Sequence, residues 1–364
     1  MAASASPEIA AFWNEFTAAQ HTLQALPLRD RVEEANTILE RHLEGLALEM
    51  SGGDDDAVVD LIATAHGSID RFPLLMQWVA AAPPLAHYRL RAFRERTTQP
   101  DFPIGMEGFE LETSDVLVAC SRDDGQAALE IRFGREIPSD YQDHARNMAF
   151  IMLDHVLGEY DFAVKVGGVD FVDGSYDPQA QWTPLSQLPA VFDRYWTHEL
   201  GRTGDFPQGE HDWGGMTITF GNRDRDDDGA GRAGGDRDES DSEGRGCGDT
   251  AIVMVNRSAN PVAMRADLAT ALVLDLAVGN SQELAVVQSL QEQAATLLEL
   301  PQLGILAYIL TRAGRRQAVY YVGDEQMARQ ALAPLLLRDE AASLEWSVRF
   351  EPTWSGYFEF AIHL

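Results

Sequence analysis

The clearest structural signal in the chain lies in residues 303–350, which read LGILAYILTRAGRRQAVYYVGDEQMARQALAPLLLRDEAASLEWSVRF. Near the end of this stretch, Leu344, Trp346, Val348 and Phe350 alternate with mostly polar residues. Successive side chains of a strand point to opposite faces of the sheet, so the alternation predicts a strand that buries a single face.

Two further strands are expected earlier in the same stretch. Residues 304–311 and 317–322 are rich in β-branched and aromatic side chains, which favour strands. The short connection between them contains Gly314, and glycine readily adopts the positive φ that a tight hairpin needs. We therefore expect a β-hairpin here.

Two helices accompany these strands. Asp324 can accept a backbone N–H at the start of a helix over 324–337, in which apolar residues recur every three or four positions. A longer helix is expected over 281–300, with Asn280 and Glu283 at capping-box spacing. The order of elements predicts a mainly antiparallel sheet covered by helices, which is an α+β fold.

The first 200 residues repeat this plan. After two helices, over 7–26 and 28–43, the patterns predict two ferredoxin-like units of strand, strand, helix and strand. Residues 99–112 read as a polar connection between the units, and a further helix is expected over 185–200. The expected elements are 46–50, 57–65, 70–82 and 88–92 in the first unit, and 116–120, 127–133, 139–157 and 160–172 in the second.

We therefore expect an N-terminal α+β domain over 1–200, with a two-helix cap, and a C-terminal α+β domain over 201–364. Strands over 213–220 and 251–255 would begin the second domain. Between them, residues 221–249 hold eight Asp, two Glu, five Arg and eight Gly, with no apolar stretch that could build a core. Such a composition is typical of a disordered insertion.

Four segments of the C-terminal domain carry a resemblance to a known family: the strand 304–311, the hairpin Gly314-Arg315-Arg316, the strand 319–322 and the closing segment 351–357 (EPTWSGY). With these segments the domain resembles the bacterial domain of unknown function 695 family. The resemblance covers roughly residue 201 to the end and depends on motifs that are mostly structural, so it implies no catalytic residues. The order of elements is also loosely similar to the ferredoxin-like regulator of ribonuclease activity B.

The charge of the chain restricts its partners. With 28 basic and 58 acidic side chains, the formal net charge is -30. Such a field repels nucleic-acid phosphates and anionic lipids, so neither nucleic acid nor membrane is an expected partner. It also keeps a protein soluble, and it would attract a basic protein partner.

The expected location is the bacterial cytoplasm. No apolar run approaches the roughly 18 residues of a membrane-spanning helix. Residues 1–8 lack the basic start and apolar stretch of a signal peptide. The two cysteines, Cys120 and Cys247, fit a reducing compartment.

The motifs of common enzyme classes are absent from the sequence. There is no Gly-x-Ser-x-Gly nucleophile elbow, no phosphate-binding loop with Lys-Ser/Thr and no dinucleotide fingerprint after a strand. His155 follows Met148 and Met152 on one face of a predicted helix, which favours a core histidine over a general base. No cofactor is therefore predicted.

One partial metal motif occurs in the insertion. Asp224, Asp226 and Asp228, followed by Gly229, match the first half of a calcium-binding loop. The twelfth position, where such a loop needs a bidentate Glu, is Gly235. The three aspartates are weak candidates for cation attraction, and no true metal site is predicted.

The best candidates for a function are residues typical of protein interfaces. Arg312, Arg315 and Arg316 cluster on the predicted hairpin, and Trp354 and Tyr357 lie in the aromatic C-terminal segment. The sequence thus favours a non-catalytic binding or regulatory protein that uses its sheet edge or this hairpin. The alternative is an uncharacterised hydrolase or metal-dependent enzyme with an Asp/His site between the domains. The oligomeric state is left open.

Overall fold

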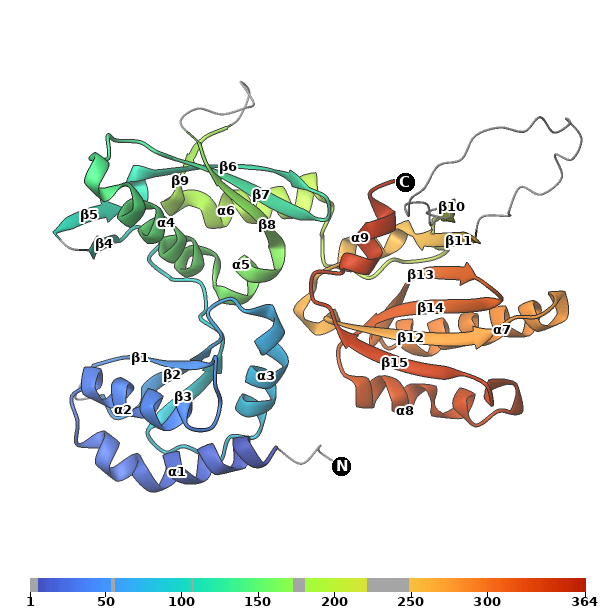
Figure 1. The fold of residues 1–364 in the computed structure, drawn as a ribbon, viewed down its shortest axis with the longest axis horizontal. Coiled ribbons are helices and arrows are strands. Elements are labelled where there is room, and N and C mark those ends of the chain that lie inside the picture. Colours follow the sequence, from blue (N-terminus) through green and yellow to red (C-terminus); the bar gives the residue numbers. More distant parts are fainter. Residues whose placement is uncertain (1–5, 54–55, 107, 173–180, 221–248) are drawn as a thin grey trace, which may run out of the picture. The chain divides into compact units, whose positions relative to one another are not determined.

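A computed structural model describes residues 6–53, 56–106, 108–172, 181–220 and 249–364. The chain divides into two compact units, Met1–Gly201 and Arg202–Leu364, and each combines mainly antiparallel strands with helices (Figure 1). The predicted α+β class with two domains is therefore confirmed. The predicted insertion lies outside the described residues, apart from its last residue, Asp249, which begins a strand.

The C-terminal unit is built on one six-stranded sheet with the order β10-β11-β13-β14-β12-β15. Every neighbouring pair is antiparallel. The hairpin between β13 and β14 forms as predicted, since Ala313 and Gly314 both have positive φ. The strands are β10 Trp213–Phe220, β11 Asp249–Asn256, β12 Thr270–Ala277, β13 Gly304–Arg312, β14 Arg315–Val322 and β15 Glu345–Phe350.

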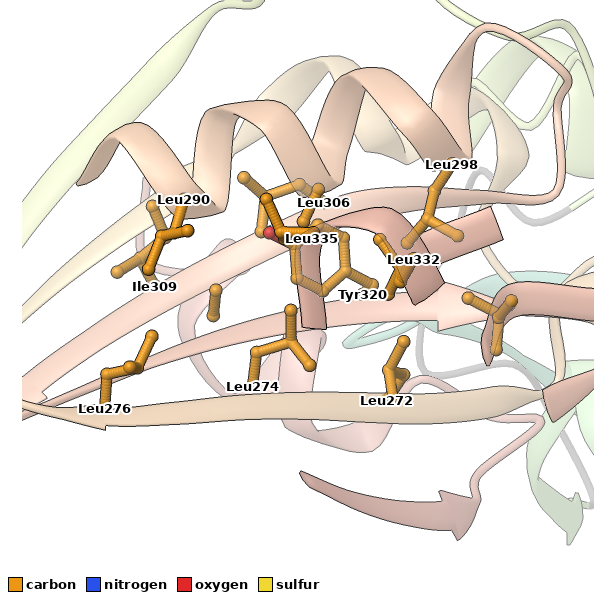
Figure 2. Close-up of a cluster of buried hydrophobic side chains, with 14 of the residues drawn as sticks. Leu272, Leu274, Leu276, Leu290, Leu298, Leu306, Ile309, Tyr320, Leu332 and Leu335 are labelled. Carbon is orange, nitrogen blue, oxygen red and sulfur yellow. The ribbon is translucent and has the colours of Figure 1, made fainter. Parts of the chain in front are cut away.

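Two helices cover one face of this sheet. α7 (Ser281–Glu299) begins where the Asn280 side chain accepts the N–H groups of Gln282 and Glu283. α8 (Glu325–Leu336) begins where Asp324 accepts the N–H of Met327. Both predicted caps are confirmed, and removing such a cap typically costs about 1 kcal/mol. Figure 2 shows the apolar core between helices and sheet, which includes Leu272, Leu274, Leu276, Leu290, Leu298, Leu306, Ile309, Tyr320, Leu332 and Leu335.

The opposite face of the same unit contacts the end of the chain. A short helix, α9 (Ser355–Ala361), packs near β11, and the Tyr308 ring of β13 lies 5.3 Å from Phe360. Short 3-10 turns at Arg257–Val262 and Ala266–Leu268 join β11 to β12. The sheet therefore lies between α7 and α8 on one face and the C-terminal tail on the other.

The N-terminal unit begins with a three-stranded sheet of order β1-β2-β3, in which β2 and β3 are parallel. The first helix packs an aromatic cluster made by Phe12, Trp13 and Trp78. Since aromatic side chains bury large areas, this cluster stabilises the helix cap on the unit. The elements are α1 Pro7–Gln24, α2 Leu28–Glu40, β1 Ala47–Ser51, β2 Val59–Thr64, α3 Phe72–Ala80 and β3 Tyr88–Ala92.

A four-stranded sheet of order β8-β7-β6-β9 follows, with β7 and β8 parallel. The segment expected to be a plain connection contains a small hairpin, β4 (Pro103–Met106) and β5 (Phe109–Glu112). The helix expected over 185–200 is divided into a 3-10 turn, α6 and a π-helical turn. The other elements are β6 Val116–Asp123, β7 Gln126–Phe133, α4 Gln142–Leu157, α5 Glu159–Lys165, β8 Val166–Phe171, β9 Thr183–Pro184 and α6 Leu188–Arg194.

The first part of the strand predicted over 160–172 is wrong, because Glu159–Lys165 form the helix α5. Its second part is confirmed by β8 (Val166–Phe171). Gly158, at φ +80°, separates α4 from α5. Glu159 is fully buried, and its carboxylate accepts the N–H groups of Ala65, Gly67 and Arg94. These contacts reach across the sequence, so tertiary structure overrides the local alternation of side chains.

Candidate functional site

The three arginines of the hairpin do not form a shared cationic patch. Arg315 Nε donates to Asp275 Oδ1 at 3.0 Å, and its Nη2 lies 2.8 Å from Glu345 Oε1. Arg316 lies on the α7 side of the sheet, donating to Gln291 Oε1 at 2.8 Å, and burial lowers its pKa. Arg312 is exposed. Arg315 and Arg316 therefore lie on opposite faces of the sheet, and each contacts neighbouring side chains there.

The two aromatic candidates are core side chains. Trp354 is fully buried, stacks on Tyr321 with ring centroids 3.8 Å apart, and donates its Nε1–H to the Leu268 carbonyl at 2.8 Å. Tyr357 is 1% exposed and donates its hydroxyl to the Asn256 carbonyl at 3.0 Å. Neither ring is accessible to a partner, so both hold the C-terminal tail against the sheet.

A buried carboxylate fixes this tail to the end of β15. Glu351 is 5% exposed, and its two oxygens accept hydrogen bonds from Ser355 Oγ at 2.7 Å, Gly356 N at 2.5 Å and Arg349 Nη2 at 2.5 Å. Charged hydrogen bonds of this kind compensate for the desolvation of the carboxylate. The closing segment EPTWSGY is therefore a structural lock.

The sheet ends in two edge strands of different character. β15 has six residues and carries Glu345 and Arg349, whose side chains are 69% and 68% exposed. β10 has eight residues, WGGMTITF, and no charged side chain. Within the described part of the chain, β10 pairs only with β11, in an unbroken register from Trp213 to Phe220.

The surface beside β10 mixes apolar and small polar side chains. On the face that carries α7, Thr217 is exposed and pairs with Ile252 of β11, which is 53% exposed. On the opposite face, Met216 and Ile218 are half-buried. An added strand would therefore find apolar surface on both faces of this edge.

The start of β10 is fixed by a polar network. The Asn256 amide donates to the Leu306 carbonyl at 2.7 Å, and its Oδ1 accepts the Ser258 N–H at 3.0 Å. This orientation turns an N–H toward His211 Nδ1, 3.0 Å away, so the neutral imidazole carries its proton on Nε2. That nitrogen lies 3.3 Å from Glu299 Oε2.

The partner carboxylate of this network lies on α7. Burial raises the pKa of Glu299, while the Leu306 N–H, which donates to Oε1 at 2.9 Å, and His211 act in the opposite direction. Through this network, the residues just before β10, His211 and Asp212, are connected to β11, to β13 and to the end of α7. The beginning of the uncharged edge is thus held in place.

The described residues hold neither a metal-binding cluster nor a cysteine that is ionised at neutral pH. Among them, no group of three or more His, Cys, Asp or Glu side chains is placed to hold a metal ion. The weak cation candidates Asp224, Asp226 and Asp228 lie outside the described ranges. Burial raises the pKa of Cys120 to about 11, so its thiol stays protonated at neutral pH.

No helix in the described part of the chain has both the length and the apolar character needed to cross a membrane. Comparisons of the chain with protein-family models, with curated proteins and with solved structures found no match. The resemblance to the domain of unknown function 695 family therefore stays a prediction.

The sequence contained part of the signal for the β10 edge. A strand was expected over 213–220, and the lack of charge in WGGMTITF can be read directly. What was missing was the position of that strand in the sheet. β12 was not predicted, so neither the strand order nor the identity of the two edges followed from the sequence.

Proposed function

We propose that this protein is a binding module whose β10 edge takes up an extended segment of a protein partner as an added strand. The observation that supports the proposal is an eight-residue edge strand without charge and without a bulge, paired on one side only among the described residues. Natural sheets usually protect such edges with charges, prolines or bulges. An unprotected edge offers a row of backbone donors and acceptors to a peptide.

The charge of the chain selects the partner. The net charge of -30 favours a segment with basic residues on its flanks. Along the segment, every second side chain would lie beside Met216 and Ile218 and should be apolar. The intervening side chains would lie beside Thr217 and Ile252, where β-branched residues fit. The proposed ligand is a short, basic, alternating strand of a protein.

A defined peptide tests this proposal. The probe has five alternating Val and Thr residues between two lysines at each end, carries a fluorophore and is measured by anisotropy. We expect micromolar binding, with slower hydrogen exchange in residues 213–220. A peptide with proline at its centre should not bind, because it cannot complete the ladder. A peptide with aspartate flanks should bind at least about tenfold more weakly.

Matched variants locate the binding edge. Thr217 and Ser347 are both exposed, one on each edge strand. Thr217→Lys should weaken binding at least about thirtyfold, because a lysine on an edge strand blocks pairing and repels a basic peptide. Ser347→Lys should leave binding within about twofold. Equal weakening by both variants, or no binding of the probe by the wild-type protein, would contradict the proposal.

A further inference from the structure

The polar network before β10 contains a histidine whose two ring nitrogens face partners with opposite preferences. His211 Nδ1 lies 3.0 Å from the side-chain nitrogen of Asn256, and Nε2 lies 3.3 Å from Glu299 Oε2. These partners are the last residues of β11 and of α7, both distant in sequence from the ring. An amide thus faces one side of the imidazole and a carboxylate faces the other.

The Asn256 amide is fixed in one orientation. Its nitrogen donates to the Leu306 carbonyl at 2.7 Å, and its oxygen accepts the Ser258 N–H at 3.0 Å. A flipped amide would place its oxygen against the Leu306 carbonyl and its nitrogen against the Ser258 N–H. Because Asn256 is fully buried, the flip would leave buried polar groups unsatisfied, which is costly. Asn256 therefore presents a hydrogen-bond donor to His211.

This fixed donor is compatible only with a neutral ring. An imidazole nitrogen has one lone pair, so Nδ1 accepts the Asn256 hydrogen only while it carries no proton itself. In the imidazolium both ring nitrogens are donors, and Nδ1 would then face the Asn256 N–H donor to donor. Proton uptake by His211 therefore breaks its hydrogen bond to Asn256.

The carboxylate on the other side of the ring favours proton uptake. Glu299 Oε1 accepts the Leu306 N–H at 2.9 Å, which fixes the carboxylate beside Nε2. Burial raises the pKa of Glu299, and the positive charge of a protonated His211 acts in the opposite direction. A carboxylate at this distance stabilises an imidazolium. The charged ring should therefore keep Glu299 as its partner and lose Asn256.

The other charged groups near the ring belong to its own segment and to the turn after β11, while β13 contributes backbone groups. Glu210 is exposed, and the Asp212 carboxylate accepts a hydrogen bond from Arg257 Nη2 at 2.8 Å. The Asp212 N–H donates to Ser258 Oγ at 2.9 Å. These contacts contain no imidazole, so they stay in place when His211 takes up a proton.

We propose that His211 is a proton-sensitive switch that fixes the start of the β10 edge when neutral and releases it when charged. The neutral ring joins Asn256 to Glu299 and holds residues 213–216 against β11. The imidazolium stays with Glu299, gives up Asn256 and loosens these residues. As regulation of peptide uptake, the switch rests on the proposed function, whereas the release itself needs no partner.

Hydrogen exchange of the full-length protein without peptide tests the release. Rates are compared at about pH 7.5 and about pH 5.5, on either side of the range in which histidine usually titrates, and are corrected for the intrinsic effect of pH. At the lower pH, residues 213–216 should exchange at least about fivefold faster relative to β15. Nitrogen NMR of the His211 ring should show a proton on Nε2 alone at the higher pH and on both nitrogens at the lower. Absence of either change would overturn the proposal.

Two histidine variants locate the switch. His211→Gln keeps an acceptor for Asn256 and does not titrate, so its exchange rates over 213–216 should stay within about twofold between the two pH values. His363 precedes Leu364, whose side chain lies against Gly214 of β10, so His363→Gln is the matched control and should respond to pH like the wild type. A full pH response in folded His211→Gln, with the fold checked by circular dichroism, would assign the release to another group and refute the switch.

The lysine-flanked peptide separates this regulation from the proposed function. It should bind the wild type at least about threefold more weakly at the lower pH, and His211→Gln within about twofold at both pH values. If residues 213–216 respond to pH as expected but the peptide binds at neither pH, the proposed function fails and the switch stands. If the peptide binds but exchange does not respond to pH, the switch fails and the proposed function stands.

Discussion

The two edge strands of the C-terminal sheet differ in how far they discourage pairing with another chain. β15 is short, carries an acid and a base, and continues into the lock around Glu351. β10 is longer and uncharged, and the network of Asn256 and His211 fixes its start. A charged edge strand discourages pairing with other chains, and an uncharged one permits it. The contrast fits the proposal that an added strand binds at β10 and not at β15.

The largest effect should come from removing the lock of the β15 edge. Glu351→Ala leaves Arg349, Ser355 and the Gly356 N–H without their acceptor and opens a cavity beneath the tail. We expect the free energy of unfolding to fall by about 3–5 kcal/mol, as is typical when one partner of a buried ionic network is removed. Urea denaturation monitored by tryptophan fluorescence measures the change.

The control for this loss is on the same tail. Glu359 is exposed on α9, so Glu359→Ala should change the free energy of unfolding by less than about 0.5 kcal/mol. A loss below about 1 kcal/mol in Glu351→Ala would mean that the tail does not stabilise the β15 side of the sheet.

A smaller loss is expected at the anchor of the β10 edge. Asn256 is fully buried, and Asn256→Ala removes hydrogen bonds to the Leu306 carbonyl, the Ser258 N–H and His211. We expect the free energy of unfolding to fall by about 2–3 kcal/mol, because the buried groups that lose their partners are uncharged. Hydrogen exchange should accelerate at the start of β10 and remain unchanged in β15, and acceleration in both strands would show that the edges are not independent.

The comparison also shows which features the sequence could predict. The caps Asn280 and Asp324 and the hairpin at Gly314 were read correctly, because each signal lies within a few residues of the structure that it specifies. The α+β class followed from the order of such local signals. The identity of the edge strands is different, since it depends on the pairing of distant strands and on β12, for which no strand was predicted.

The candidate site was harder to predict for the same reason. Trp354 and Tyr357 have the composition of an interface, but large aromatic side chains are equally typical of cores, and only the fold shows that both are buried. Arg315 lies far in sequence from the carboxylate of Asp275 that engages it, 40 positions earlier. His155 belongs to a helix predicted correctly, yet the hollow of about 310 Å³ that it lines is completed by residues 97–104, which are distant in sequence.

Salt should weaken the binding of a basic peptide to the β10 edge. Raising sodium chloride from about 50 mM to about 500 mM shortens the screening length from more than 10 Å to less than 5 Å. We expect the lysine-flanked peptide to lose about five- to tenfold in affinity, while a peptide with serine flanks stays within about twofold. Anisotropy titrations at both salt concentrations measure this, and equal losses for the two peptides would assign the affinity to the strand alone.

The smallest effect is expected from the charged residues of β15 itself. Glu345→Gln removes an ion pair with Arg315 whose side chains are 69% and 40% exposed, and exposed pairs of this kind contribute about 0–1 kcal/mol. The Asp275 carboxylate still holds Arg315 in place. We therefore expect a fall in the free energy of unfolding of less than about 1 kcal/mol, together with no binding of the lysine-flanked peptide to β15. Hydrogen exchange of residues 345–350 in the presence of the peptide shows whether the peptide binds to β15. Protection of β15 in this variant would mean that a single charge, and not the length and anchoring of the strand, separates the two edges.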